Sequence, residues 1–102
     1  MMPPGRFSPR ARRELREAAE WIAEDSPAAA EALLRAAIQA ADMITSRPGL
    51  AHLRPDLATA RFHFWSLRGF PYILVFDVDR SPPVVARMVH QSRDLPAVLG
   101  DL

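Results

Sequence analysis

Three short apolar runs in the last third of the chain decide the fold. They read Arg61-Phe62-His63-Phe64-Trp65, Tyr72-Ile73-Leu74-Val75-Phe76 and Ala86-Arg87-Met88-Val89-His90. Glycine and proline separate them, in Arg68-Gly69-Phe70-Pro71 and in Asp79-Arg80-Ser81-Pro82-Pro83. Short β-rich runs joined by such turns predict the strands of one antiparallel sheet.

Alternation along each run predicts which side chains share a face of the sheet. In the first run, Phe62 and Phe64 share one face, and Arg61, His63 and Trp65 share the other. The second run is apolar on both faces until Asp77, which is typical of an inner strand. The third run extends from Val84 to His90 and is expected to place Arg87 between Val85 and Val89, with Met88 and His90 on the opposite face.

Two helices are predicted before the strands. Ser8-Pro9 is a helix start signal, because the serine hydroxyl caps a free amide and proline has no amide hydrogen to satisfy. That helix runs to about Glu24, with Ala11, Leu15, Ala18 and Ile22 on one face. Ser26-Pro27 repeats the signal, and a second helix runs from Ala28 to about Ser46 before Arg47-Pro48-Gly49 ends it. The short gap makes the two helices an αα-hairpin.

The second helix carries more apolar surface than one hairpin contact requires. Its polar residues form a thin stripe, while Leu33, Leu34, Ile38, Met43 and Ile44 spread over several sides. To be buried, these side chains must pack against the sheet, against a partner, or against both. With Arg6-Phe7 as a short edge strand, the order is β-α-α-β-β-β, an α+β fold in a single domain over residues 1–102.

Composition narrows the function classes. The chain has 102 residues, 49% of them hydrophobic, a formal net charge of +1 and no cysteine. The missing cysteine excludes disulfides and thiolate metal sites, and the near-zero net charge does not indicate general nucleic-acid affinity. No apolar run approaches the length of about 18 residues that a membrane span needs, and Met1-Met2-Pro3-Pro4 does not resemble a signal peptide. A cytoplasmic protein is expected.

All 13 positively charged side chains are arginines. Four of them, Arg10, Arg12, Arg13 and Arg16, lie at the start of the first helix, where the helix dipole is positive and each such charge costs roughly a few tenths of a kcal/mol. Either they are tolerated on a solvated face, or an acidic partner or the phosphates of nucleic acid lie across this end.

The ordered set of motifs resembles the RelE/ParE superfamily of toxins from bacterial toxin–antitoxin pairs, and its ParE branch in particular. The set comprises Phe7-Ser8-Pro9-Arg10-Ala11, Leu53-Arg54-Pro55-Asp56-Leu57, Arg61-Phe62, Phe70-Pro71-Tyr72-Ile73-Leu74-Val75-Phe76 and Val89-His90-Gln91-Ser92-Arg93-Asp94-Leu95. The resemblance covers nearly the whole chain and implies a helical hairpin packed on a small, twisted antiparallel sheet.

The resemblance implies one of two activities. RelE-like toxins cleave messenger RNA on the ribosome, which requires a proton acceptor, a proton donor and cations for the charged transition state. Candidates for such an endoribonuclease site are Arg61, His63, Arg87, His90 and Arg93. The chain lacks the lysines and the tyrosine near the C-terminus that these toxins usually have, so this activity is the alternative.

The preferred hypothesis is a ParE-like toxin, which by resemblance inhibits DNA gyrase and arrests growth without chemistry of its own. No catalytic residue, cofactor or metal is then expected. The target-binding candidates are Arg61, Arg68, Arg87 and Arg93. For Arg61, Arg68 and Arg87, the competing interpretation is that each is a sheet arginine paired with an acid such as Asp77 or Asp56. The chain also departs from the family, because Phe76-Asp77 replaces the tyrosine-arginine pair that is common at the end of the central strand.

A cognate antitoxin, ParD-like or similar, is the partner that the resemblance implies, in a hetero-oligomer. Direct sequence-specific DNA binding and membrane contact by this chain are not expected. An acidic antitoxin segment that is disordered alone is expected to fold along both helices. The candidates for this contact are Arg12, Arg13, Arg16, Leu33, Leu34 and Ile38. A third hypothesis is a non-toxic module that only binds the antitoxin.

Overall fold

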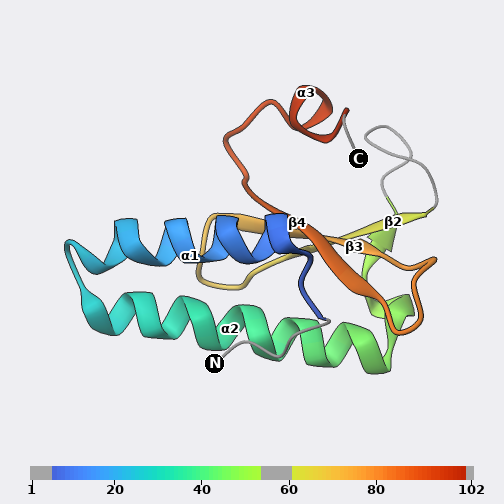
Figure 1. Cartoon of the computed structure of the whole chain (residues 1–102), viewed down its shortest axis with the longest axis horizontal. Helices are drawn as coiled ribbons and strands as arrows, with labels where there is room; N and C mark the ends of the chain where they lie inside the picture. Colours follow the sequence, from blue (N-terminus) through green and yellow to red (C-terminus); the bar gives the residue numbers. More distant parts are fainter. Residues whose placement is uncertain (1–5, 54–60, 101–102) are drawn as a thin grey trace.

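The computed structural model describes residues 6–53 and 61–100. Its elements are α1 (Pro9–Ala23), α2 (Pro27–Ser46), the 3₁₀ turn η1 (Pro48–Leu50), β1 (His52–Leu53), β2 (Phe62–Ser66), β3 (Tyr72–Asp77), β4 (Val84–His90) and α3 (Leu95–Leu99). The four strands form one antiparallel sheet in the order β1-β2-β3-β4. Two helices followed by this sheet confirm the predicted α+β arrangement (Figure 1). The motif residues 54–57, with the proposed partner Asp56, lie outside the described residues.

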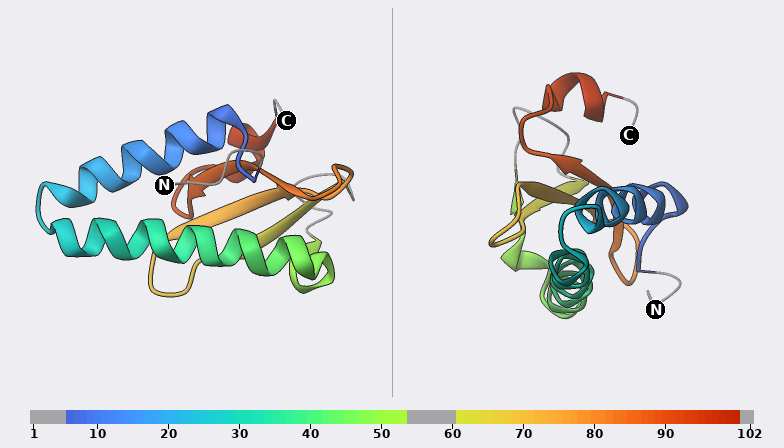
Figure 2. Two further views of the ribbon diagram at one scale, coloured as in Figure 1. Left: turned by 60° about the horizontal axis from the view of Figure 1, so that its bottom comes forward. Right: turned by 90° about the vertical axis from the view of Figure 1, so that its left-hand side faces the viewer.

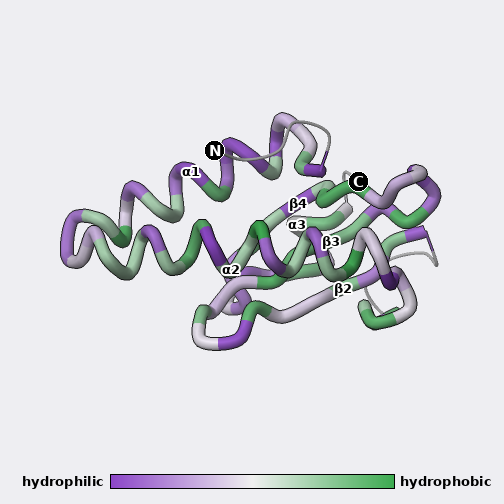
Figure 3. Tube along the Cα trace, turned by 90° about the horizontal axis from the view of Figure 1, so that it is seen from below, coloured by the Kyte–Doolittle hydropathy of each residue, from purple (hydrophilic) through white to green (hydrophobic). Residues whose placement is uncertain are grey.

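The two predicted start signals act as helix N-caps. Ser8 Oγ accepts a hydrogen bond from the Ala11 N–H at 3.0 Å, and Ser26 Oγ accepts one from the Ala29 N–H at 3.1 Å. Each helix has a proline in its first turn and neither has an acid there. Of the two helices, α1 is the more hydrophilic along its length (Figure 3). The caps fix where both helices begin, so the predicted hairpin is confirmed.

The sheet separates two apolar clusters. The larger lies between the sheet and the hairpin, where Leu15, Leu33 and Ile44 are fully buried with Leu74 and Phe76. The smaller lies on the other face of the sheet, under α3, and contains Phe62, Phe64, Ile73, Val75, Val89 and Leu99. Figure 2 shows α3 on the far side of the sheet from α2. The segment that follows Arg93 therefore has a packing role.

The alternation predicted for the third strand is wrong at its centre. Val75 of β3 pairs with Arg87, but the register then shifts and leaves Ala86 as an extra residue in β4. Because of this bulge, Val85 belongs to the cluster under the hairpin while Val89 belongs to the cluster under α3. Arg87 therefore does not lie between two valines on one face.

The start of the chain seals the outer edge of β4. The short edge strand expected at Arg6-Phe7 is a single parallel bridge between Phe7 and Val85. The Val85 N–H donates to the Arg6 carbonyl at 2.7 Å, and the Ser8 N–H donates to the Val85 carbonyl at 2.8 Å. Ser8 Oγ also donates to the Ala86 carbonyl at 2.9 Å. These bonds satisfy edge groups that could otherwise pair with a foreign strand, and they anchor α1 to the sheet.

Within residues 6–53 and 61–100, no helix combines the length and the apolar content that a bilayer crossing requires.

Candidate functional site

A groove of about 830 Å³ runs between α1 and α2. Arg12, Arg13 and Arg16 line it from α1, and Leu34 and Ile38 line it from α2. The other lining residues are Pro9, Ala19, Glu20, Ala23, Pro27, Ala30 and Glu31. The groove thus combines apolar surface with a row of guanidinium groups. That combination suits a segment that carries both apolar and acidic side chains.

The groove contains five of the six antitoxin-binding candidates. The sixth, Leu33, is fully buried in the cluster under the hairpin, together with Ala37 and Ile44. Successive residues of a helix point about 100° apart, so Leu33 faces the sheet while Leu34 faces the groove. The broad apolar surface of α2 therefore has two uses, one against the sheet and one in the groove with Ile38.

Charge is polarised along the groove. Arg12 and Arg16 lie in the first half of α1. Glu20 and Glu31 line the groove nearer the turn that joins the two helices. An occupant with acidic residues at one end would be oriented by this polarity, because like charges would meet in the reverse orientation.

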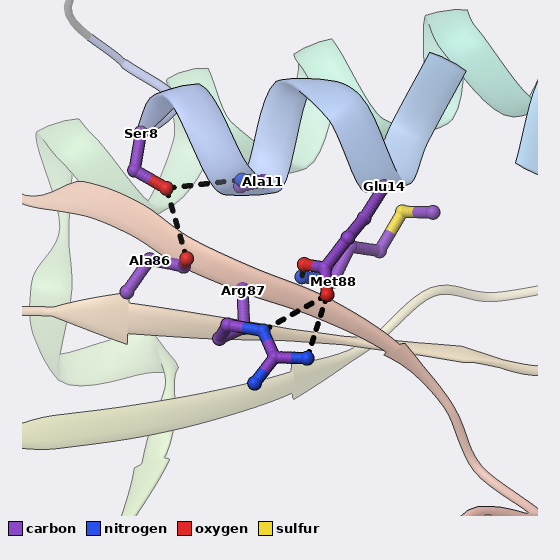
Figure 4. A network of polar contacts seen from close by, with 6 residues as sticks. All are labelled: Ser8, Ala11, Glu14, Ala86, Arg87 and Met88. Carbon is purple, nitrogen blue, oxygen red and sulfur yellow. Dashed lines mark hydrogen bonds and ion pairs between the residues drawn. The ribbon is translucent and has the colours of Figure 1, made fainter. Parts of the chain in front are cut away.

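Arg87, a candidate for target binding and for catalysis, is held in a buried ion pair. Its side chain is 5% exposed, and Nε and Nη2 donate to Glu14 Oε2 at 2.9 and 2.7 Å. Glu14 Oε1 accepts a hydrogen bond from the Met88 N–H at 2.9 Å. One carboxylate therefore holds both the arginine and the edge of β4 (Figure 4).

Glu14 is the residue that sequence reasoning missed. The competing interpretation paired Arg87 with Asp77 or Asp56, whereas its partner comes from α1. A signal was present, because an arginine inside an apolar strand needs a carboxylate on the element that covers that strand. Choosing among the acids of α1 required the packing of α1 against β4.

Arg61 is paired as well. Its Nε and Nη2 donate to Asp77 Oδ1 and Oδ2 at 3.1 and 2.8 Å, and the Asp79 N–H donates to Asp77 Oδ1 at 3.1 Å. The hydrogen bonds from Arg61 hold the pKa of Asp77 below its ordinary value despite burial, and the same pair raises the pKa of Arg61. Asp77 stands where the family resemblance suggests an arginine, and here it binds one.

Asp77 should make the protein lose stability in acid. A carboxylate with a lowered folded pKa contributes fully above its unfolded pKa of about 3.9, and the contribution is lost as pH falls through the folded value. We expect the free energy of unfolding, from urea denaturation, to fall more steeply below about pH 5 in the wild type than in Asp77→Asn. Parallel acid profiles for the two proteins would contradict this role of the pair.

The five endoribonuclease candidates do not converge on one point. Arg61 binds Asp77 at one end of β3, whereas His90 pairs with Tyr72 at the other end. Tyr72 and Asp77 are five positions apart along β3, which is about 17 Å. His63 is near the Arg61 end, since it pairs with Phe76, and its buried Nδ1 has no hydrogen-bond partner among the residues that the structure describes.

The remaining three endoribonuclease candidates share a second, polar cleft. It has a volume of about 430 Å³, lies between the start of α1 and the end of β4, and is lined by Arg87, His90 and Arg93 among others. The target-binding candidate Arg68 lies elsewhere, exposed in the β2–β3 turn. Within the described parts of the chain, Arg68 and Arg93 form no ion pair. Over the same residues, no group of three or more histidine or acidic side chains is arranged to hold a metal ion.

The chain is a small α+β protein with a groove on its helical hairpin that is lined by apolar side chains and arginines. A family model described as the ParE toxin of the type II toxin–antitoxin system parDE matches residues 6–95, and the chain belongs to this family. The resemblance predicted from the motifs is thereby confirmed, and a toxin of a type II system is paired with an antitoxin. Searches of curated proteins and of solved structures gave no match.

Proposed function

We propose that this toxin inhibits DNA gyrase by binding it, and that a cognate antitoxin neutralises the toxin by occupying the α1–α2 groove. The family match over residues 6–95 carries the proposal, because it identifies a ParE toxin. The gyrase target follows from the ParE resemblance of the motifs. The groove supplies a surface for the antitoxin.

A mode of action without chemistry is supported by the state of the arginines. Arg61 and Arg87, two of the three that a ribonuclease mechanism would use, are already bound to carboxylates. A guanidinium that is neutralised in this way stabilises a phosphoryl transition state less well. Arg68 and Arg93 are exposed, on the β2–β3 turn and after β4, and they are the better candidates for contact with a protein target.

The groove fits an antitoxin segment of defined chemistry. Apolar side chains of the segment would pack on Leu34 and Ile38, and its carboxylates would pair with Arg12, Arg13 and Arg16. The acidic end of the segment would lie over the start of α1, where it would also interact favourably with the helix dipole. A tail that is disordered alone and folds on binding meets these requirements.

Expression of the chain without its antitoxin should arrest growth and leave damaged DNA. The measurement combines colony counts after induction with a DNA-damage reporter and with mapping of transcript ends. Cleaved transcripts without DNA damage would contradict the proposal and favour the RelE-like alternative. Normal growth at verified protein levels would favour the non-toxic module.

The same assay tests the exposed arginines. Because an arginine at the centre of an interface contributes about 1–3 kcal/mol, Arg68→Ala combined with Arg93→Ala should reduce toxicity by at least about tenfold in inducer dose. Arg35→Ala combined with Arg47→Ala removes the same charge from exposed positions of α2 and its C-cap. This control should remain as toxic as the wild type.

A further inference from the structure

We infer that the polar cleft between α1 and the end of β4 binds a phosphate group, at a site separate from the α1–α2 groove. Arg10 and Arg13 line the cleft from the first two turns of α1. Tyr72, His90 and Arg93 line it from β3, from β4 and from the segment after β4. The inference is independent of the gyrase proposal, because it depends only on this cleft.

The cleft concentrates the positive charge of the protein. Four arginines line it, Arg10, Arg13, Arg87 and Arg93, against the two glutamates Glu14 and Glu17, so its formal charge is 4 − 2 = +2. The whole chain has a formal charge of +1, which leaves −1 for everything else. A charge of this sign, gathered in one concave place, favours an anionic ligand.

One of the two glutamates is fully occupied within the protein. Glu14 accepts hydrogen bonds from Arg87 through one oxygen and from the Met88 N–H through the other. Among the residues that line the cleft, Glu17 is the other acid, beside the three arginines Arg10, Arg13 and Arg93. The buried Glu14–Arg87 pair forms one wall of the cleft. The positive charge available to an anion comes from Arg10, Arg13 and Arg93.

The chemistry of the rim favours phosphate among anions. Guanidinium groups are planar forks whose paired N–H groups match two oxygens of a phosphate. Arg10 and Arg13 are three residues apart on one helix, which makes them neighbours on its surface. Arg93 comes from a different element, so a tetrahedral anion between them could be held from two directions.

His90 adds a ring N–H donor to the cleft. The Ser92 N–H donates to His90 Nδ1 at 3.1 Å, so Nδ1 is an acceptor and the neutral ring carries its proton on Nε2. Tyr72 holds the ring edge-on, with centroids 5.2 Å apart and planes at 80°. Imidazole and phenol donors beside arginines are groups that proteins use to contact phosphate oxygens.

A bound phosphate also accounts for the order of charges along α1. The first turn of this helix holds no acidic residue, and its arginines oppose the positive end of the helix dipole. An anion in the cleft would be attracted by the arginines and by the dipole together. The arrangement is thus unfavourable for the chain alone and favourable when the cleft is filled.

The test is titration of the purified full chain with inorganic phosphate in a phosphate-free buffer of low salt, followed by NMR of the arginine Nε–H groups and the His90 ring. We expect saturable shifts at the cleft, and an affinity at least about tenfold lower in Arg10→Ala and in Arg93→Ala. Arg12→Ala is the matched control, because it removes the same charge from the same helix but lines only the α1–α2 groove. Its affinity should stay within about twofold of the wild type.

A second titration identifies the source of the phosphate. If the natural ligand is a nucleic-acid phosphodiester, a single-stranded DNA oligonucleotide will displace inorganic phosphate. The logarithm of the oligonucleotide's binding constant will then fall with the logarithm of the salt concentration, with a slope of about −0.7 for each phosphate contacted. If the ligand is a small phosphate compound, the oligonucleotide will not compete.

Three results would overturn the inference. They are the absence of saturable phosphate binding, equal losses in Arg12→Ala and Arg93→Ala, and acetate binding as tight as phosphate binding. Circular dichroism of each variant verifies that the fold is intact. Since no gyrase or antitoxin is present, failure here leaves the proposed function untouched, and failure of the gyrase proposal leaves the cleft untouched.

Discussion

Replacing Glu14 by alanine should lower the free energy of unfolding by about 3–5 kcal/mol, which is the range for removing one partner of a buried ion pair. The substitution leaves the Arg87 guanidinium, with its side chain 5% exposed, without its carboxylate. It also removes the acceptor of the Met88 N–H on the outer edge of β4. Because small domains have only about 5–15 kcal/mol of stability, urea denaturation should show a large shift of the midpoint.

Two companion variants separate the roles of Glu14. Glu14→Gln keeps one acceptor oxygen for the Met88 N–H but loses the charge and the second acceptor that binds Arg87, so it should retain about 1 kcal/mol more stability than Glu14→Ala. Glu17→Ala is the matched control, since it removes an exposed carboxylate one turn further along the same helix and should change stability by less than about 0.5 kcal/mol. If Glu14→Ala costs no more than Glu17→Ala, the pair does not lock α1 to β4.

Reversing two charges in the α1–α2 groove should weaken antitoxin binding by at least about 100-fold. The variant Arg12→Glu with Arg16→Glu turns two attractions for antitoxin carboxylates into repulsions, and each factor of ten corresponds to about 1.4 kcal/mol. Calorimetry with the purified antitoxin measures the affinity. Raising the salt concentration should reduce the difference in antitoxin affinity between the wild type and this variant, because salt screens surface charges.

The control for this pair is Arg35→Glu with Arg47→Glu. Both residues are exposed and neither lines the groove, while the change in net charge is identical. We expect the control to bind the antitoxin within a few-fold of the wild type. Equal losses of antitoxin affinity in the two double variants would show that only net charge matters. The α1–α2 groove would then not be the antitoxin-binding site.

Local signals made the helices predictable. Ser8-Pro9 and Ser26-Pro27 each encode a cap and a first turn within two residues, and the structure begins both helices there. The strands followed from apolar runs between turns. In contrast, His52–Leu53 is too short to show any alternation, and Leu95–Leu99 owes its place to packing of Leu99 under the sheet.

Features that depend on contacts between two distant segments could not be predicted from the sequence. The extra residue Ala86 changes which face Val85 occupies, and nothing in an apolar run marks such a bulge. The partner of Arg87 is on α1, 73 residues away, so the pair needed the packing of α1 on β4. Leu33 and Leu34 are both leucines on an apolar helix, and only the direction of the sheet shows which one remains for a partner.

The candidate site was predictable in its chemistry rather than in its geometry. A row of arginines at the start of the first helix left three interpretations open: a solvated face, an acidic partner or a phosphate. The structure divides that row, because Arg12 and Arg16 line the α1–α2 groove, Arg10 lines the polar cleft, and Arg13 lines both. Helical angles alone could not reveal this division without the positions of α2 and β4.

The most direct measurement is a supercoiling assay with purified gyrase, relaxed plasmid and the purified toxin, with and without its antitoxin. We expect the toxin to block supercoiling and to leave cleaved plasmid, and we expect the antitoxin to restore gyrase activity with the wild-type toxin but not with the Arg12→Glu and Arg16→Glu toxin. Full gyrase activity at toxin concentrations that arrest growth, together with cleaved messenger RNA, would contradict it.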